Sequence, residues 1–98
     1  MNSSRRLQHN LAALSNLDEP VRRRLYEYVA SQDRPVGRDE AAAAAHIGRT
    51  LAAYHLDKLA EHELLRVSYE RLGKRRGQGG GRPAKLYSRF PRELTGLF

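Results

Sequence analysis

Positive charge and glycine are concentrated between residues 73 and 85. The segment GKRRGQGGGRPAK contains five glycines, five basic side chains and no acidic residue in thirteen positions. Glycine would break a helix, and a flexible linker has no need of the charge. Glycine does let a backbone bend and approach a ligand closely, and lysine and arginine bind phosphate oxygens. We therefore predict a loop that presents five cations to an anionic partner: Lys74, Arg75, Arg76, Arg82 and Lys85.

The other reactive residues do not form a catalytic motif. The glycine loop does not match GxGxxG, because Arg82 stands at the sixth position counted from Gly77, and it lacks the lysine and Ser/Thr order of a P-loop. The chain has no cysteine, and none of its serines has the sequence context of an activated nucleophile. We expect no enzymatic activity and no cofactor.

Four potential metal ligands lie on one predicted helix: His55, Asp57, Glu61 and His62. The two histidines are seven residues apart, which is about 10 Å along a helix and too far to share one ion without other ligands. We expect His55 to pack beside Leu56 and Leu59, and we predict no metal site.

The positive charge of the chain gathers in its last third. The 98 residues carry a formal net charge of +7, and residues 66–98 alone hold nine basic and two acidic side chains. Such an uneven basic charge is typical of proteins that bind the phosphate backbone of nucleic acids, although basic surfaces also serve solubility or acidic lipid. No apolar run approaches the ~20 residues of a membrane span. Residues 1–10 lack the apolar core of a signal peptide. We expect one small soluble domain in the cytoplasm, without a membrane partner.

Two amphipathic helices are predicted in the first third. Leu7, Leu11 and Leu14 recur at helical spacing within residues 1–16. The segment LDEPVRRRLYEYVASQ predicts a helix with Asp18 as N-cap and Pro20 in its first turn, which ends before residues 33–35. We expect the arginines at 22–24 to lie on its solvated surface, where one of them could reach a phosphate.

The segment VGRDEAAAAAHIGRTLAAYHLDKLAEHELL predicts two helices joined by a three-residue turn. Gly37 can cap the first helix, and Asp39 and Glu40 in its first turn favour the helix dipole and approximate a capping box. The five alanines that follow let a neighbouring helix approach closely. Residues 46–48 then end the first helix and begin the second. This arrangement matches a helix-turn-helix.

The second helix of the pair has an apolar and an outward face. Ala52, Leu56 and Leu59 fall at i, i+4 and i+7 and should face the core. The outward face then consists of Arg49, Thr50, Ala53, Tyr54 and Asp57. In a major groove, Arg49 could read a guanine, Thr50 could bond a phosphate or base, and Tyr54 could add a phosphate or apolar contact.

Two short strands are predicted after these helices. RVSYERL and KLYSRF are rich in β-branched and aromatic residues, and the basic glycine loop joins them. We expect Tyr69 and Tyr87 to pack within the strands. Two strands joined by a basic loop behind a helix-turn-helix predict a winged helix-turn-helix, a mainly α fold with a small β-hairpin. It should span residues 17–90, with a tail at 91–98.

Three segments together resemble a known family: LDEPVRRRLYEYV, DEAAAAAHIGRTLAAYHLDKLAEHELL and GRPAKLY. They look like the DNA-binding half of bacterial winged-helix transcriptional regulators of the ArsR-like superfamily, especially those whose wing ends in GRPAKLY. The resemblance covers residues 17 to 90. It implies a protein that binds double-stranded DNA in a sequence-specific manner as a dimer, and that represses or activates a promoter. A repressor is the expected form.

The sequence departs from that family at His46 and Glu63, where relatives usually have glycine. Both positions tend to need positive φ, at a cost on the order of 1 kcal/mol for another residue.

An interaction module for protein or RNA remains the alternative function. We expect a homodimer in which Leu7, Leu11 and Leu14 form the contact, together with Leu94, Leu97 and Phe98.

Overall fold

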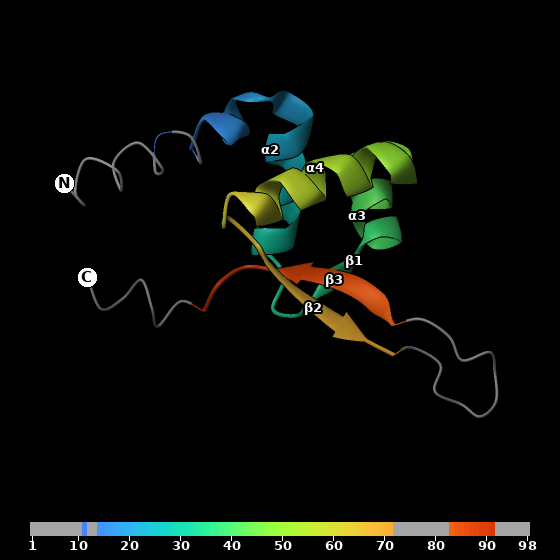
Figure 1. Ribbon diagram of the computed structural model, residues 1–98. Coiled ribbons are helices and arrows are strands. Elements are labelled where there is room, and N and C mark those ends of the chain that lie inside the picture. The colour runs from blue at the N-terminus through green and yellow to red at the C-terminus, as the bar shows by residue number, and fades with distance from the viewer. Residues whose placement is uncertain (1–10, 12–13, 72–82, 92–98) are drawn as a thin grey trace.

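A computed structural model describes residue 11, residues 14–71 and residues 83–91. This part of the chain is mainly helical with a small three-stranded antiparallel sheet (Figure 1). The elements in chain order are the 3-10 helix η1 (Asn16–Asp18), α2 (Pro20–Ala30), β1 (Val36–Gly37), α3 (Arg38–Ala45), α4 (Arg49–Glu61), β2 (Arg66–Glu70) and β3 (Ala84–Ser88). None of the described helices is long and apolar enough to cross a membrane.

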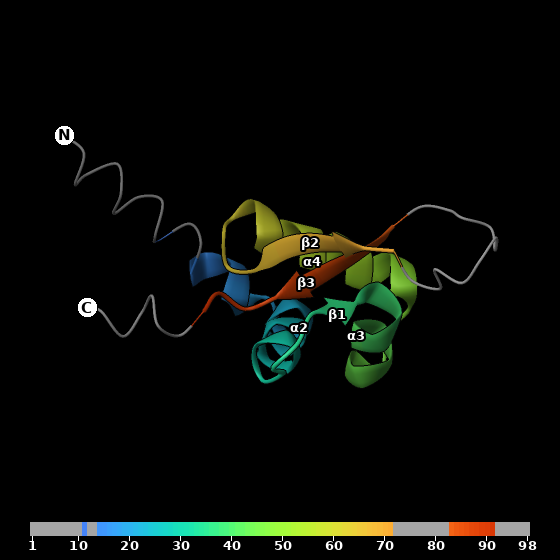
Figure 2. The same ribbon diagram turned by 90° about the horizontal axis from the view of Figure 1, so that it is seen from below.

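The predicted hairpin is confirmed and gains a third strand. β3 lies in the centre of the sheet, between β1 and β2. Val67 on β2 and Val36 on β1 both pair with Tyr87 on β3. The helices lie on one face of this sheet, and Figure 2 shows the sheet from the opposite side. The two-residue β1 was not predicted, because so short a segment carries no periodicity of its own.

Helix α2 begins one residue later than expected. Its N-cap is Glu19, whose carboxylate accepts a hydrogen bond from the backbone N–H of Arg22 at 2.7 Å. Asp18, which the sequence placed at the cap, belongs to η1 instead. Pro20 occupies the first helical position, where its missing N–H is harmless. The helix ends at Ala30, before residues 33–35 as predicted.

The first turn of α3 is tied to α2 through Glu40. Gly37 is the N-cap, as predicted, but no side chain completes a capping box. The Glu40 carboxylate instead accepts hydrogen bonds from Arg34 at 2.6 Å and from the Tyr28 hydroxyl at 2.5 Å. The bonds from Arg34 and Tyr28 lower the pKa of Glu40 to about 2.

Helices α3 and α4 both end in a left-handed residue that is not glycine. His46 has φ 59° and Glu63 has φ 60°. After α3, Ile47 N–H donates to Ala42 O and His46 N–H donates to Ala43 O. After α4, Leu64 N–H donates to Leu59 O and Glu63 N–H donates to Ala60 O, which repeats the same spacing along the chain. Both turns are therefore Schellman motifs. The expected positive φ at both positions is confirmed.

One hydrophobic core lies between the helices and the sheet. Leu25, Leu56, Leu59 and Tyr87 are fully buried there. Ala41, Ala42 and Ala45 line the core side of α3, so that this helix packs closely on its neighbours.

Only two of the apolar side chains assigned to the dimer contact lie in the described part of the chain. Leu11 and Leu14 are helical, and each side chain is 58% exposed. Leu7, Leu94, Leu97 and Phe98 lie outside the described residues. The dimer contact assigned to these side chains therefore stays a prediction.

Candidate nucleic-acid interface

The predicted helical phase of α4 is confirmed. Ala52, Leu56 and Leu59 are fully buried against the core. On the opposite face Arg49 and Thr50 are exposed and Tyr54 is 52% exposed, while Ala53 and Asp57 are half-buried. Leu51, which the sequence did not single out, is 44% exposed beside them. The N-terminal turn of α4 thus has little part in the core.

Arg49 at the start of α4 has one ion-pair partner among the described residues. Its Nε lies 2.9 Å from Oδ1 of Asp39 on α3, and both side chains are well exposed. Exposed pairs of this kind stabilise a fold by about 0.2–1 kcal/mol. The guanidinium of Arg49 can therefore leave Asp39 for a phosphate or base edge at small cost.

The ring of Tyr54 lies within reach of two cations. The Arg22 guanidinium is 5.9 Å from the ring centroid and the Lys58 Nζ is 5.8 Å from it. His55 meets the same ring edge-on at 5.1 Å. These contacts hold the ring on the outer surface of α4.

Asp57 and Lys85, which the sequence assigned to the recognition helix and to the loop, contact one another. Lys85 Nζ donates to Asp57 Oδ1 at 2.8 Å, and the Tyr87 hydroxyl donates to the same oxygen at 2.5 Å. Arg38, the first residue of α3, donates from Nε to the Tyr87 hydroxyl at 3.2 Å and lies 3.5 Å from Asp57 Oδ2. We call Arg38, Asp57, Lys85 and Tyr87 the Asp57 cluster.

The Asp57 cluster favours the charged forms of Asp57 and Lys85 and the neutral form of Tyr87. Burial alone would raise the pKa of Asp57, but the bonds from Lys85 and Tyr87 and the nearby cations outweigh it and hold the pKa below its ordinary value. The hydrogen bond to Asp57 raises the pKa of Lys85. Burial and the same carboxylate raise the pKa of the Tyr87 phenol. At neutral pH the cluster holds one anion between two cations.

A second polar group lies on the other flank of α4. Arg22 on α2 donates from Nε to His55 Nδ1 at 3.0 Å and from Nη1 to the side-chain oxygen of Asn16. Glu19 lies 3.8 Å from His55 Nε2. We call these four residues the Arg22 cluster. Burial lowers the pKa of His55, and the Arg22 charge lowers it further against a weaker opposite effect of Glu19.

The outcome for the arginine run 22–24 is mixed. Arg23 and Arg24 are exposed, as expected, although Arg24 also donates to the Ala45 carbonyl at 3.1 Å. For Arg22 the expectation was wrong, since its guanidinium is turned inward to the buried His55. His55 itself is 5% exposed, as the prediction of a packed histidine required.

Among the described residues, no group of three or more His, Cys, Asp or Glu side chains is arranged to hold a metal ion. The three candidate ligands within α4 each contact a different basic residue. His55 contacts Arg22, Asp57 contacts Lys85, and Glu61 lies 3.7 Å from Lys58.

The β2–β3 hairpin holds both ends of the basic loop. Glu70 at the end of β2 pairs with Ala84 at the start of β3. Lys74, Arg75, Arg76 and Arg82 lie outside the described residues, so their assignment to the loop rests on the sequence.

A cleft of about 650 Å³ lies between the loop end of the hairpin and the starts of α3 and α4. Arg38, Arg49 and Lys85 line this cleft together with three acidic residues.

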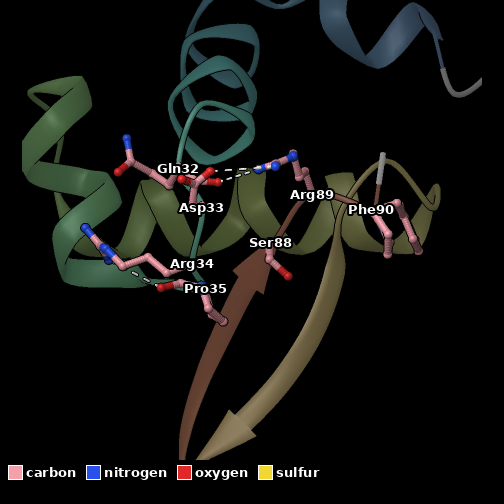
Figure 3. Close-up of a pocket in the computed structure, with 8 residues that line it drawn as sticks. Gln32, Asp33, Arg34, Pro35, Ser88, Arg89 and Phe90 are labelled. Carbon is pink, nitrogen blue, oxygen red and sulfur yellow. Dashed lines mark hydrogen bonds and ion pairs between the residues drawn. The ribbon is translucent and has the colours of Figure 1, made fainter. Parts of the chain in front are cut away.

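At the other end of β3, Arg89 ties the sheet to the chain that follows α2. Its Nη1 donates to the Gln32 carbonyl at 2.6 Å, and Nη2 lies 3.7 Å from Asp33 (Figure 3). Its buried Nε has no hydrogen-bond partner in the described part of the chain. These residues line a smaller pocket of about 190 Å³.

Sequence reasoning missed Arg38 and the polar role of Tyr87. Tyr87 was expected to pack in the sheet and is fully buried, but a buried phenol also needs a hydrogen-bond partner, and that was the available signal. Tyr69 was expected to pack in the same way and is instead 64% exposed.

Comparisons of the chain with known protein families, curated proteins and solved structures found no match.

Proposed function

We propose that this chain is a winged helix-turn-helix protein that binds double-stranded DNA with sequence specificity and acts as a dimeric transcriptional repressor. In this proposal α3 and α4 form the helix-turn-helix, α4 is the recognition helix, and the β2–β3 hairpin with its loop is the wing. The order of helix, helix and hairpin supports this assignment. The similarity to ArsR-like regulators rests on the sequence segments quoted above.

The observation that carries the proposal is the exposed N-terminal turn of α4. A recognition helix contacts base edges with residues near its N-terminus, which must therefore be free of core packing. Arg49 and Thr50 are exposed there, and Tyr54 follows one turn later on the same face. Arginine pairs in bidentate fashion with guanine, and its pair with Asp39 is weak enough to exchange.

The charge distribution supports DNA as the partner. Residues 66–98, with nine basic and two acidic side chains, account for the whole formal net charge of +7. Phosphate contacts from these side chains would add affinity without sequence preference, and they would make binding strongly dependent on salt.

Dimerisation is part of the proposal because a single domain of this size reads a short half-site. The exposed Leu11 and Leu14 offer an apolar surface next to η1. Two copies related by a two-fold axis would place their α4 helices about 34 Å apart, on half-sites separated by one helical turn.

Substituting Arg49 tests the proposal. A binding site is first selected from random duplexes with the wild-type protein, and affinities for this site and for a scrambled duplex are then compared. Arg49→Ala should lose about 1–3 kcal/mol of discrimination, which corresponds to about 5- to 150-fold. Arg23→Ala is the matched control, because Arg23 is also an exposed arginine with one ion pair but lies on α2.

Two results would count against the proposal. Equal losses on both duplexes would show that Arg49 does not read bases. Failure to enrich any duplex, with equal or tighter binding to single strands or RNA, would favour the alternative of an RNA or protein-interaction module.

A further inference from the structure

The Asp57 cluster joins the two surfaces that the proposed function assigns to DNA. Asp57 belongs to α4, whereas Lys85 and Tyr87 belong to the central strand β3, which leads directly out of the basic loop. We propose that Asp57 is a positioning residue that sets the hairpin and its loop relative to α4, and that it does not itself read DNA. This inference rests on the proposed function.

The carboxylate of Asp57 is already occupied by its neighbours. Oδ1 accepts from Lys85 and Tyr87, and Oδ2 lies 3.5 Å from Arg38. To accept a hydrogen bond from a cytosine amino group, Asp57 would have to give up part of this arrangement. Its negative charge would also approach the phosphates. The geometry therefore favours a role within the protein over direct reading.

The Asp57 cluster lies close to the end of the hairpin from which the loop extends. Lys85 pairs with Tyr69 across the hairpin, one residue pair away from the Glu70–Ala84 pair that borders the loop. Lys85 and Tyr87 are two residues apart and so point to the same side of β3, toward α4. Holding both side chains at Asp57 fixes the direction in which the strands enter the loop.

The ring of Tyr87 provides an anchor that makes this direction specific. Tyr87 is fully buried, with Val36 and Val67 as its cross-strand neighbours. Its ring therefore fixes the depth of β3 in the core, while the hydroxyl bond to Asp57 fixes β3 relative to α4. Arg38 donates to the same hydroxyl, so that α3 also contributes to this contact between β3 and α4, which we call the joint.

Neutralising Asp57 has two opposite consequences for DNA binding. The cluster changes from one anion between two cations to two unbalanced cations, Arg38 and Lys85, which repel each other and loosen the joint. The added net positive charge strengthens binding to any duplex, whereas the loosened joint weakens the contribution of the loop. If Asp57 merely supported the fold, its substitution would weaken binding to any duplex and the contribution of the loop together.

The test is a double-mutant cycle between Asp57→Asn and the loop variant Arg75→Ala/Arg76→Ala. Affinity for the selected and scrambled duplexes is measured at several salt concentrations, at a temperature where circular dichroism shows every variant folded. In the wild-type background the loop variant should weaken binding and lower the salt slope by about 0.9 for each lost phosphate contact. In the Asp57→Asn background this loss should shrink by at least about threefold, the size expected of coupled sites.

Glu61→Gln is the matched control for charge. Glu61 lies on α4 four residues after Asp57, it is exposed, and its ion-pair partner is Lys58 on the same helix. This variant should raise affinity for both duplexes and leave the effect of the loop variant unchanged. Tyr87→Phe keeps the Asp57 charge and provides a second way to weaken the joint if Asp57→Asn does not fold.

Two outcomes would overturn the inference. If the loop variant loses the same factor in the wild-type, Asp57→Asn and Tyr87→Phe backgrounds, the cluster does not position the loop. Alternatively, Asp57→Asn would change the preference at a single base pair and nothing else, which would make Asp57 a direct reader. Failure of the proposed function is distinguishable, because the wild-type protein would then select no duplex at all.

Discussion

The Arg22 cluster and the Asp57 cluster attach α4 to different neighbours through opposite arrangements of charge. In the Arg22 cluster a cation donates to the uncharged acceptors of His55 and Asn16, and it links α4 to α2 and η1. In the Asp57 cluster an anion accepts from Lys85 and Tyr87, and it links α4 to β3 and α3. The first holds helix to helix, and the second holds helix to sheet.

Because of this difference, we expect the Arg22 cluster to affect mainly the stability of the fold and the Asp57 cluster to affect mainly the placement of the hairpin relative to α4. Losing Arg22 leaves a buried histidine nitrogen without its donor, and the cost falls on folding. The Asp57 cluster is nearer to solvent, and its cations line the cleft between the loop end of the hairpin and the starts of α3 and α4. Disturbing it should cost less stability and have more effect on how the proposed DNA-binding surfaces are placed.

The largest effect on stability is expected for Arg22→Ala. The variant removes the hydrogen bonds to His55 and Asn16, so the free energy of unfolding should fall by about 1–3 kcal/mol. Urea denaturation measures this change. Arg23→Ala is the control on the same helix, because its exposed i,i+4 pair with Glu27 should change stability by no more than about 0.5 kcal/mol. Similar losses in both variants would remove the distinction between the inward and outward arginines.

A smaller effect is expected for Tyr87→Phe. The variant keeps the buried ring and removes the hydroxyl, which donates to Asp57 and accepts from Arg38, while Asp57 retains Lys85 as a donor. The free energy of unfolding should fall by about 1–2 kcal/mol, because each of the two lost hydrogen bonds contributes about 1 kcal/mol. Tyr69→Phe, at an exposed position of β2, should be nearly neutral in the same thermal or chemical denaturation. A neutral Tyr87→Phe would show that the hydroxyl bond does not hold β3 to α4.

The smallest effect is a dependence of stability on pH that only the Arg22 cluster should show near neutrality. Because the pKa of His55 is lowered in the folded protein, the unfolded chain takes up a proton first as the pH falls below about 6.5. The contribution of His55 to stability is thus complete above that pH and declines below it, by at most about 1.4 kcal/mol per pH unit. Denaturation at pH 7.5 and 5.5 measures it.

His55→Asn is the comparison for the pH effect, since an amide oxygen can accept from Arg22 but does not titrate. The difference in stability between pH 7.5 and 5.5 should be smaller in this variant than in the wild-type protein. An unchanged difference would place the pH dependence outside the Arg22 cluster.

Local sequence patterns predicted the features that depend on local geometry. The inward face of α4 follows from the spacing of Ala52, Leu56 and Leu59. Positive φ at His46 and Glu63 was expected from the family resemblance, because relatives usually have glycine there. The cap of α2 was wrong by one residue, because adjacent Asp18 and Glu19 both carry oxygens that can accept from the first helical N–H groups.

Contacts between distant segments were beyond such patterns. Asp57 and Lys85 are 28 positions apart, and their pairing depends on the register of the hairpin and on its tilt against α4. Tyr69 and Tyr87 look alike in sequence, but Tyr69 is opposite Lys85 near the loop, where the hairpin extends beyond the helices (Figure 1). Alternation along a strand gives the face of a residue, whereas burial also needs a covering layer.

The two Schellman turns have a consequence for how this chain can diversify. They fix where α4 begins and ends through backbone hydrogen bonds, and three core side chains fix its rotation. The fold therefore depends little on the identity of Arg49 and Thr50. If α4 reads DNA as we propose, descendants of this sequence can acquire new target sites by exchanging these outward residues, while the scaffold is inherited unchanged.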